Sequence, residues 1–241
     1  MAASVTPDSE NSKLSFDQAQ DIRRWLQTRD PTDTVGSGYQ ASIYLYRGPG
    51  GEFVIKEALG SMLRKKLSET SIRREQKVYQ RLSRVPGIPK CFGLLDDKYL
   101  VLEYVSGDSY RRLQNRLDNR ERFFSGLLTT LNGMHEAGVA HGDLKRKDNI
   151  LVGPNQEPFI IDFGIAVIAE GRRGFVFNLI RQADLNAWIK HKYQGDMENL
   201  SAEDAKIYRP MLLEKVARVI RIVWQTLTLR RWRKRHRARD V

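Results

Sequence analysis

The most informative part of this sequence reads His141-Gly142-Asp143-Leu144-Lys145, and it runs on to Asn149-Ile150-Leu151-Val152. A second stretch, Ile160-Ile161-Asp162-Phe163-Gly164, follows shortly after. The apolar residues of the two stretches predict a short hairpin, with Asp143 and Asp162 on the loops beside it. Two carboxylates beside an asparagine suit phosphoryl transfer, because one carboxylate orients the attacking hydroxyl while the other joins the asparagine in holding Mg²⁺.

Length and composition indicate a globular chain of one large domain or two small lobes. The chain has 241 residues, of which 41% are hydrophobic, so it can bury a sizeable core. Its one cysteine, Cys91, is expected to be a buried apolar residue and fits a reducing cytoplasm. Neither a signal peptide nor a membrane span is expected. The net charge of +12 favours anionic partners.

A glycine-rich segment precedes the first expected hairpin. It reads Val35-Gly36-Ser37-Gly38-Tyr39-Gln40-Ala41, and its glycines let backbone N–H groups approach phosphate oxygens. Alternating residues at 43–46 and 53–56 flank the turn signal Pro49-Gly50-Gly51 and predict two paired strands, the second ending at Lys56. The glycine pattern alone is weak evidence, because a plain hairpin turn has the same composition.

The remaining periodicity predicts mainly helices and one more strand pair. Helices are expected at 16–28 (with Ser15 as N-cap), 67–84, 110–118, 121–137 and 183–193, and strands at 91–95 and 99–104. The apolar stripe of the fourth helix is expected to be core: Phe123, Phe124, Leu127, Leu128, Leu131 and Met134. A last helix is expected from Ser201 onward, with the stripe Leu212, Val216, Val219, Ile220, Val223 and Leu227.

Together these motifs resemble those of protein kinases. The first stretch is similar to the family's catalytic loop, H-x-D-L-K…N, the second to its D-F-G, and the glycine-rich hairpin with Lys56 to its nucleotide-binding lobe. The resemblance implies an α+β, bilobal kinase-like fold, with an antiparallel sheet and one helix in the N-lobe and a small, mostly helical C-lobe. The expected division is 1–34 for an N-terminal extension with a short helix, 35–105 for the N-lobe, 106–200 for the C-lobe and 201–241 for a basic amphipathic helix and tail.

The resemblance implies that the N-lobe binds ATP. Gly36, Ser37 and Gly38 would cover the phosphates, although Ala41 departs from the third glycine of the family pattern. The hinge, whose backbone binds adenine in the family, is placed by position alone at Glu103 to Val105.

The strand lysine and a helix glutamate form the next expected pair. By resemblance, Lys56 would hold the α- and β-phosphates and Glu75 would pair with it and align it, with Glu69 as the alternative. From its neighbours alone, Glu75 is more often a solvated helix residue with basic partners.

The catalytic loop would supply the remaining groups. Asp143 would act as the base or orient the acceptor hydroxyl, and Lys145 would neutralise charge on the transferred phosphoryl group. Asp162 and Asn149 would hold Mg²⁺. Asn149 comes one position later than the family spacing, and Asp148 occupies the expected position, so Asp148 remains the alternative ligand.

Two further residues have expected supporting roles. His141 would be a scaffold residue that packs on Phe163, as a lone histidine before a loop usually is structural. Asp184 either hydrogen-bonds the catalytic-loop backbone, as a helix aspartate does in kinases, or is an ordinary N-cap.

The chain also departs from the common kinase pattern. Gly142 replaces the usual arginine before the catalytic aspartate, and no A-P-E follows Gly164. The short C-lobe resembles the compact atypical kinases: the RIO and Bud32 groups and the bacterial lipopolysaccharide-core kinases. We therefore expect an ATP:hydroxyl phosphotransferase, with a protein serine/threonine acceptor preferred and a lipopolysaccharide-core sugar as the alternative. A nucleotide-binding pseudokinase scaffold is the non-enzymatic alternative, disfavoured because Lys56, Asp143, Asn149 and Asp162 are all present.

The C-terminal segment leaves two interpretations open. Its apolar stripe predicts a helix docked on the C-lobe with a solvated basic tail, or an interfacial helix on anionic lipid with Trp224 and Trp232 at headgroup depth. Nucleic acid is a less favoured partner, because no aromatic-interleaved recognition motif is present. A cytoplasmic location is expected, with peripheral attachment to the inner face of the membrane in the second interpretation.

Overall fold

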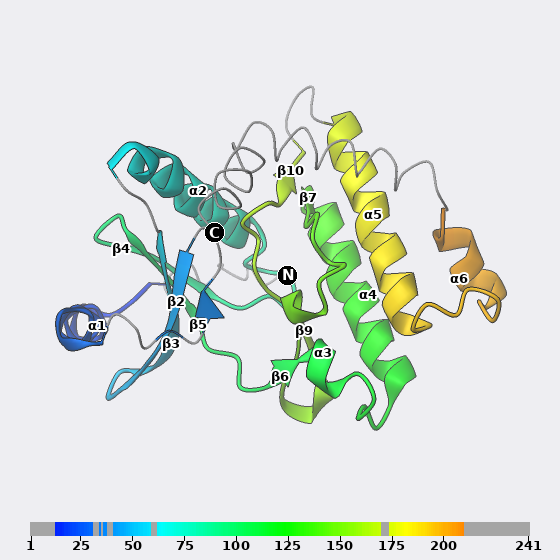
Figure 1. Ribbon diagram of the computed structural model, residues 1–241, viewed down its shortest axis with the longest axis horizontal. Helices are drawn as coiled ribbons and strands as arrows, with labels where there is room; N and C mark the ends of the chain where they lie inside the picture. Colours follow the sequence, from blue (N-terminus) through cyan, green and yellow to red (C-terminus); the bar gives the residue numbers. More distant parts are fainter. Residues whose placement is uncertain are drawn as a thin grey trace, which may run out of the picture.

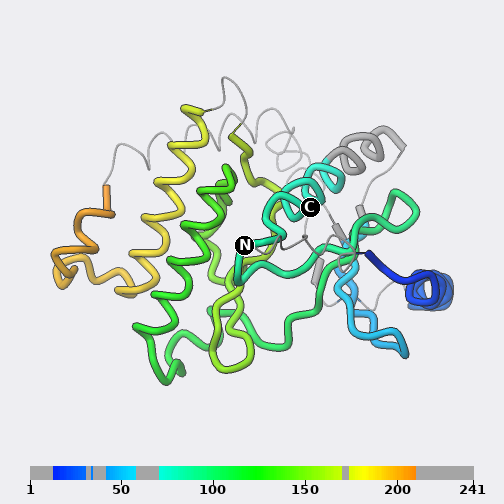
Figure 2. The backbone as a smooth tube through the Cα atoms, turned by 180° about the vertical axis from the view of Figure 1, so that it is seen from behind, coloured from blue at the N-terminus to red at the C-terminus, as the bar shows by residue number. Residues whose placement is uncertain are grey.

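The computed structural model describes residues 13–30, 34, 36–37, 41–58, 62–169 and 174–209, without the side chains of 36–37, 41, 58 and 62–70. Two parts lie side by side (Figure 1). One holds a five-stranded sheet with helix α2 (Met62–Arg81), and the other is built around helices α4 (Arg120–Glu136) and α5 (Gly174–Lys192). The reverse view shows the same division, with the backbone passing between the parts after the last sheet strand (Figure 2). This is the expected α+β, bilobal kinase-like arrangement.

The sheet is antiparallel in the order β1-β2-β3-β5-β4. Its strands are β1 (Gly36–Ser37), β2 (Ala41–Gly48), β3 (Gly51–Ala58), β4 (Cys91–Leu95) and β5 (Tyr99–Glu103). The turn between β2 and β3 needs a glycine, because Gly51 has a φ of 123°. Side chains alternate along β3, so Phe53 and Ile55 join the core under helix α1 (Phe16–Thr28). Val54 and Lys56 therefore face the opposite side, where α2 packs.

Helix α1 occupies its predicted range and closes one face of the sheet. Ser15 accepts a hydrogen bond from Gln18 N (3.2 Å), and Gln18 Oε1 accepts one from Ser15 N (2.9 Å), which makes a capping box. Ile22 is fully buried against the sheet, and Trp25 meets Tyr46 edge to face. The expected N-cap of this helix, Ser15, is therefore confirmed.

The second part holds the helices and three short strand pairs. After the one-turn helix α3 (Tyr110–Leu113) and α4, strand β7 (Val139–Ala140) pairs with β10 (Val167–Ile168). The predicted hairpin is formed by β8 (Ile150–Val152) and β9 (Pro158–Ile160), in the register Ile150 to Ile160. Strand β6 (Asp108–Ser109) adds to its edge, and the 3₁₀ turns η2 (Lys147–Asn149) and η3 (Pro154–Gln156) flank β8. The stripe predicted for α4 is buried, with Leu128 at its half-buried margin.

Four helix boundaries differ from the prediction by more than one helical turn. Helix α2 begins at Met62 instead of 67, because the intervening Arg64, Lys65 and Lys66 favour helix without contributing to an apolar stripe. Helix α3 ends at Leu113 instead of 118, because Gln114 O accepts from Arg120 Nη1 (3.0 Å) and Asp118 N donates to Gln156 Oε1 (2.8 Å). These bonds replace the helical one that would join the two backbone groups.

The other two differences concern the C-terminal helices. Helix α5 begins at Gly174 instead of 183, since tertiary packing of Phe177 outweighs the weak periodicity of its first turns. Helix α6 (Ala202–Ile207) ends before Tyr208, which is extended, and does not run on through the stripe expected after Ser201. Pro210 explains the stop, because a proline disfavours helix at the residue before it. The stripe at 212–227 lies outside the described residues.

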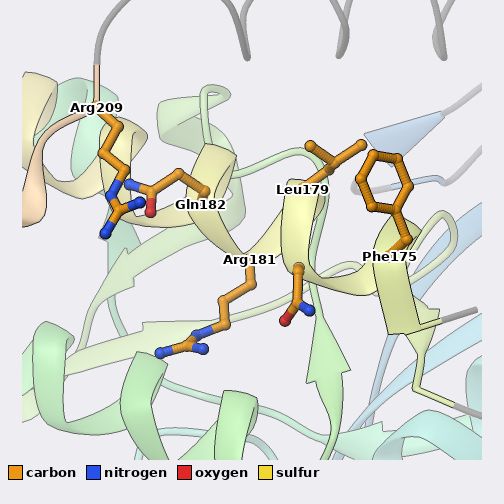
Figure 3. A pocket seen from close by; sticks show the side chains of 6 residues that line it. Phe175, Leu179, Arg181, Gln182 and Arg209 are labelled. Atoms are coloured by element: carbon orange, nitrogen blue, oxygen red, sulfur yellow. The ribbon is translucent and has the colours of Figure 1, made fainter.

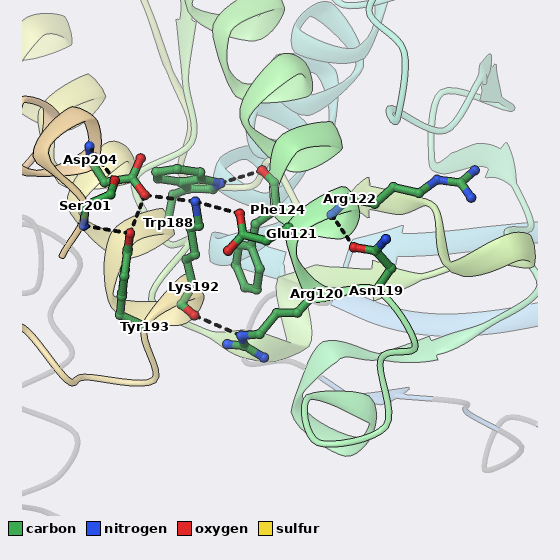
Figure 4. A network of polar contacts seen from close by, with 10 residues as sticks. All are labelled: Asn119, Arg120, Glu121, Arg122, Phe124, Trp188, Lys192, Tyr193, Ser201 and Asp204. Atoms are coloured by element: carbon green, nitrogen blue, oxygen red, sulfur yellow. Dashed lines mark hydrogen bonds and ion pairs between the residues drawn. The ribbon is translucent and has the colours of Figure 1, made fainter. Parts of the chain in front are cut away.

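A polar network docks α6 on the ends of α4 and α5 (Figure 4). Lys192 Nζ lies 2.8 Å from Asp204 Oδ2 and 3.0 Å from Glu121 Oε2, and Tyr193 donates to Asp204 (2.6 Å). Burial raises the pKa of Asp204, but the hydrogen bonds from Lys192 and Tyr193 outweigh burial and hold it below its usual range.

Within the described ranges, no helix is long and apolar enough to cross a membrane.

Candidate active site

The site begins with a buried lysine between two carboxylates. Lys56 Nζ, on β3, lies 2.6 Å from Glu75 Oε1, on α2, and 3.1 Å from Asp162 Oδ1. Lys56 and Glu75 are only 6% and 5% exposed. Burial lowers the pKa of Lys56, but the charges of Glu75 and Asp162 outweigh burial and raise it, so the ammonium stays charged. The expected pair of Lys56 with Glu75 is present, and the side chain of the alternative, Glu69, lies outside the described residues.

Asp162 is held at the mouth of this buried pair. It follows β9 with a left-handed φ of 68°, a conformation that aspartate tolerates better than bulkier residues. Its side chain is 43% exposed while one oxygen contacts Lys56, so the carboxylate also faces outward. Burial raises the pKa of Asp162, but the charge and hydrogen bond of Lys56 hold it below its usual range. The group is ionised at neutral pH.

A buried aspartate on α5 holds the backbone of the catalytic loop by hydrogen bonds. Asp184 is 1% exposed, and its two oxygens accept hydrogen bonds from His141 N (2.7 Å) and Gly142 N (3.0 Å). Gly142 has a φ of 81°, so the residue that replaces the family's arginine suits the left-handed turn at this point. Of the two expectations for Asp184, the hydrogen bonds to the loop backbone are the one that the structure shows.

His141 connects the two acidic loops. Its Nδ1 accepts from Asp143 N (3.2 Å), so Nε2 carries the proton and donates to Ile161 O (2.9 Å). The imidazole lies 5.0 Å from the ring of Phe163, as expected for a scaffold residue. One neutral side chain therefore sets the spacing between the backbones that carry Asp143 and Asp162.

Asp143 and Asn149 lie at opposite ends of the catalytic loop and meet through a hydrogen bond. Asn149 Nδ2 donates to Asp143 O (3.0 Å), and Asn149 is 3% exposed. The carboxylate of Asp143 is partly exposed and lies 3.9 Å from Arg146 Nη1. Lys145 is an exposed residue of this loop.

Asp148 points away from this arrangement. Its oxygens accept from Arg111 Nε at 2.8 and 2.9 Å, and the hydrogen bond from Arg111 holds the pKa of Asp148 below its usual range. The residue at the family's expected position is therefore engaged by α3, whereas the side chain of Asn149 turns into the loop.

The glycine-rich loop is only partly described, whereas the hinge at 103–105 is described throughout. Gly36 and Ser37 form β1 and pair with Ile43 and Ser42, while Gly38 lies outside the described residues. At the hinge, Glu103 N donates to Lys90 O (2.8 Å), and Glu103 Oε2 accepts from Lys90 N (2.9 Å). The N–H of Glu103 is already bonded to Lys90 O, so it is not free for adenine. Hydrogen bonds from the hinge to adenine would therefore come from backbone carbonyl groups and from Val105.

Several residues that support the site were not predicted. Tyr79 packs edge to face on Phe163 at 5.0 Å, His135 Nε2 lies 3.3 Å from Asp184 Oδ2, and His191 Nε2 donates to Leu144 O (2.8 Å). Burial lowers the pKa of His191, so its ring is neutral. These residues lie on α2, α4 and α5, far from the loop in sequence, and no local pattern distinguishes them from ordinary helix residues.

Cys91 has no part in the site. It is partly buried in β4, and burial raises the pKa of its thiol to about 11. The thiol is therefore protonated at neutral pH. Cys91 packs against the core as expected, but it is half-buried where full burial was predicted.

Comparison with known families identifies this arrangement. Residues 30–183 match the protein kinase domain. The chain belongs to the protein kinase family. This kinase is 31% identical over 190 residues to Aurora kinase A-B of Xenopus laevis, covering 70% of the chain and 46% of the relative.

Two plant kinases give similar matches. Serine/threonine-protein kinase Aurora-1 of Arabidopsis thaliana is 32% identical over 177 residues, covering 69% of the chain and 59% of the relative. CBL-interacting protein kinase 25 of Oryza sativa subsp. japonica is 32% identical over 154 residues, covering 58% of the chain and 30% of the relative. The chain thus spans less than two thirds of the length of each of these relatives.

Proposed function

We propose that this kinase transfers the γ-phosphoryl group of ATP to a serine or threonine hydroxyl of a protein. The observation that carries the proposal is the position of Lys56 Nζ, within 3.1 Å of both Glu75 and Asp162. A charged ammonium beside an outward-facing carboxylate suits a phosphate chain with its metal ion, because it presents one cation to the phosphates and one anion to the metal.

The residues present fit Mg²⁺. Asp162 offers an ionised, 43% exposed carboxylate, and Asn149 offers an amide oxygen, since its Nδ2 is the atom bonded to Asp143 O. Mg²⁺ prefers such oxygen ligands, and when bound it would neutralise charge on the phosphates. Lys56 would contact the α- and β-phosphates, held in place by Glu75, and the backbone of 36–38 would cover them.

Asp143 and Lys145 would act on the acceptor side. We assign Asp143 to orient the acceptor hydroxyl and take its proton, because its partly exposed carboxylate sits on a loop whose backbone is held by His141 and Asp184. Lys145 is assigned to neutralise charge that develops on the transferred group. Phosphoryl transfer asks mainly for positioning and charge neutralisation, so a rigid loop is the chief requirement.

Two observations bear on the acceptor, and they favour different ones. The H-x-D-L-K form of the loop and the serine/threonine kinase name of the Arabidopsis relative favour a protein acceptor. The short stretch 165–173 between Gly164 and α5 instead favours the compact atypical kinases, since it offers a peptide little platform. The alternative acceptor is therefore a sugar hydroxyl of a lipopolysaccharide core, reached at the inner face of the membrane.

A labelling assay tests the proposal. The full chain is incubated with γ-labelled ATP and Mg²⁺, with either a generic protein substrate or a lipopolysaccharide-core fraction, and Asp143→Ala is the matched control. Label on serine or threonine, absent in the control, is the expected result. Label on the sugar fraction alone would select the alternative acceptor. ATP-dependent thermal stabilisation with no labelled product at all would show a nucleotide-binding scaffold and overturn the proposal.

A further inference from the structure

Near the start of α5, Phe175 and Leu179 form the apolar part of a surface hollow whose other lining residues are polar or charged. Phe175 is 72% exposed, whereas Phe177 on the opposite side of the helix is buried. A hollow of about 300 Å³ opens beside Phe175 (Figure 3). Its lining residues are Phe175, Asn178, Leu179, Arg181, Gln182 and Arg209. A single exposed aromatic is ordinary on a protein surface. Phe175 differs because the hollow beside it is also lined by Arg209, at the end of the described chain.

The C-terminal segment leaves the described structure at the wall of this hollow. Asn186, which is 2% exposed, accepts from Arg209 N (3.2 Å) and donates to Arg209 O (2.9 Å). Gln182 Nε2 also donates to Ile207 O (2.9 Å). These three bonds hold the backbone against α5 at the point of departure, and the side chain of Arg209 forms part of the lining. Residue 210 therefore starts at the edge of the hollow.

The sequence after Arg209 has the complementary character. Six apolar residues recur at helical spacing: Leu212, Val216, Val219, Ile220, Val223 and Leu227. Arg218 and Arg221 fall between them on the other side. As a helix, 210–227 would be about 27 Å long, enough to cover the first turns of α5. The stripe needs an apolar partner, and the surface at Phe175 lacks one among the described residues.

We propose that residues 210–227 fold as a helix whose apolar stripe docks on Phe175 and Leu179 of the same molecule, with Arg218 and Arg221 turned outward. Covalent attachment favours this segment over other partners for the hollow. A segment joined to the chain at the rim has an effective concentration on the order of millimolar, so it binds there in preference to a second copy or a lipid surface. The proposal does not depend on the catalytic activity of the chain.

Disulfide trapping in the full chain tests this contact. The background is Cys91→Ser, which removes the one native thiol, and Asn178→Cys places a thiol at the exposed rim of the hollow. It is combined with Leu212→Cys, Val216→Cys or Val219→Cys in turn, and with Arg218→Cys as the matched control. Mild oxidation is expected to give an intramolecular disulfide at least fivefold more with the best stripe position than with the control. Equal trapping, no trapping with any stripe position, or disulfide-linked dimers would overturn the proposal.

Hydrogen–deuterium exchange gives an independent readout. Val219→Asp with Ile220→Asp is expected to raise amide exchange over 175–182, and Arg218→Ala is expected to leave it unchanged. Flotation with vesicles of phosphatidylcholine and phosphatidylglycerol separates the lipid occupant. If the aspartate variant loses vesicle binding but exchange over 175–182 does not change, the stripe serves a membrane and the proposal is wrong.

Discussion

Lys56 Nζ lies 3.1 Å from Asp162 Oδ1, although the two residues are 106 positions apart in the chain. The contact joins the sheet of the first part to the acidic loop of the second, and Glu75 holds the lysine from the other side at 2.6 Å. Because both carboxylates converge on one buried ammonium, the position of this cation depends on the sheet, on α2 and on the hairpin at once. The predictions below test what this relationship and its supports do.

Removal of the buried cation should disable the kinase. Lys56→Met keeps an unbranched side chain one atom shorter than lysine but leaves Glu75 and Asp162 facing each other without their shared partner. We expect phosphoryl transfer to fall by about a hundredfold or more. Steady-state turnover with γ-labelled ATP measures this. Lys98→Met is the matched control, since Lys98 pairs with Glu57 on β3 at a 44% exposed site, and it should retain activity within about twofold. Equal rates for the two variants would contradict the assignment of Lys56.

Asn149 and Asp148 should differ as candidates for the metal ligand. Asn149→Ala is expected to raise the Mg²⁺ concentration for half-maximal activity by about tenfold or more, because even residues that only support a metal ligand contribute about that much. Asp148→Ala should change it by less than about threefold, because Arg111 already engages that carboxylate. Titration of activity with MgCl₂ gives both values, and thermal melting shows whether each variant is folded. A larger shift for Asp148→Ala would make Asp148 the ligand.

Loss of Asp184 should destabilise the chain through the catalytic loop. Asp184→Ala leaves the N–H groups of His141 and Gly142 buried without their acceptor, at a cost of about 3 kcal/mol in the free energy of unfolding. Urea denaturation followed by tryptophan fluorescence measures it. Asp97→Asn removes an exposed ion pair with Arg73, keeps a residue that tolerates the left-handed φ of 56° at this position, and should cost less than about 1 kcal/mol. Similar costs for the two aspartates would show that Asp184 does not carry the loop.

Acid should reduce the contribution of Asp162 to the free energy of unfolding. Its pKa in the folded chain is below the ordinary value of about 4, so the unfolded chain takes up the proton first as pH falls. The stabilisation is therefore complete above about pH 5 and is lost as pH drops through the lower, folded-state value. The unfolding free energy of the wild type minus that of Asp162→Asn should shrink over this window. In a Lys56→Met background this difference should shrink less with falling pH, since the cation that lowers the pKa of Asp162 is gone. An unchanged pH dependence in that background would show that Lys56 does not lower the pKa.

The sequence by itself determined the chemistry and the local frame of the site. His141, Asp143 and Asp162 were recognisable because their motifs are local, and β8, β9 and α1 followed from short-range signals such as the N-cap at Ser15. Helix ends were less predictable, as α3 and α5 show, because burial of single residues such as Phe177 outweighs weak periodicity.

Only the tertiary structure decided which polar groups meet. Arg111 engages Asp148, and this contact distinguishes Asp148 from Asn149 as a candidate metal ligand. The catalytic loop is supported by Asp184, His135 and His191, which lie on two other helices. The physical reason is that a buried charge or N–H group takes its partner from whatever element packing brings within about 3 Å, and that choice has no period or spacing in the chain.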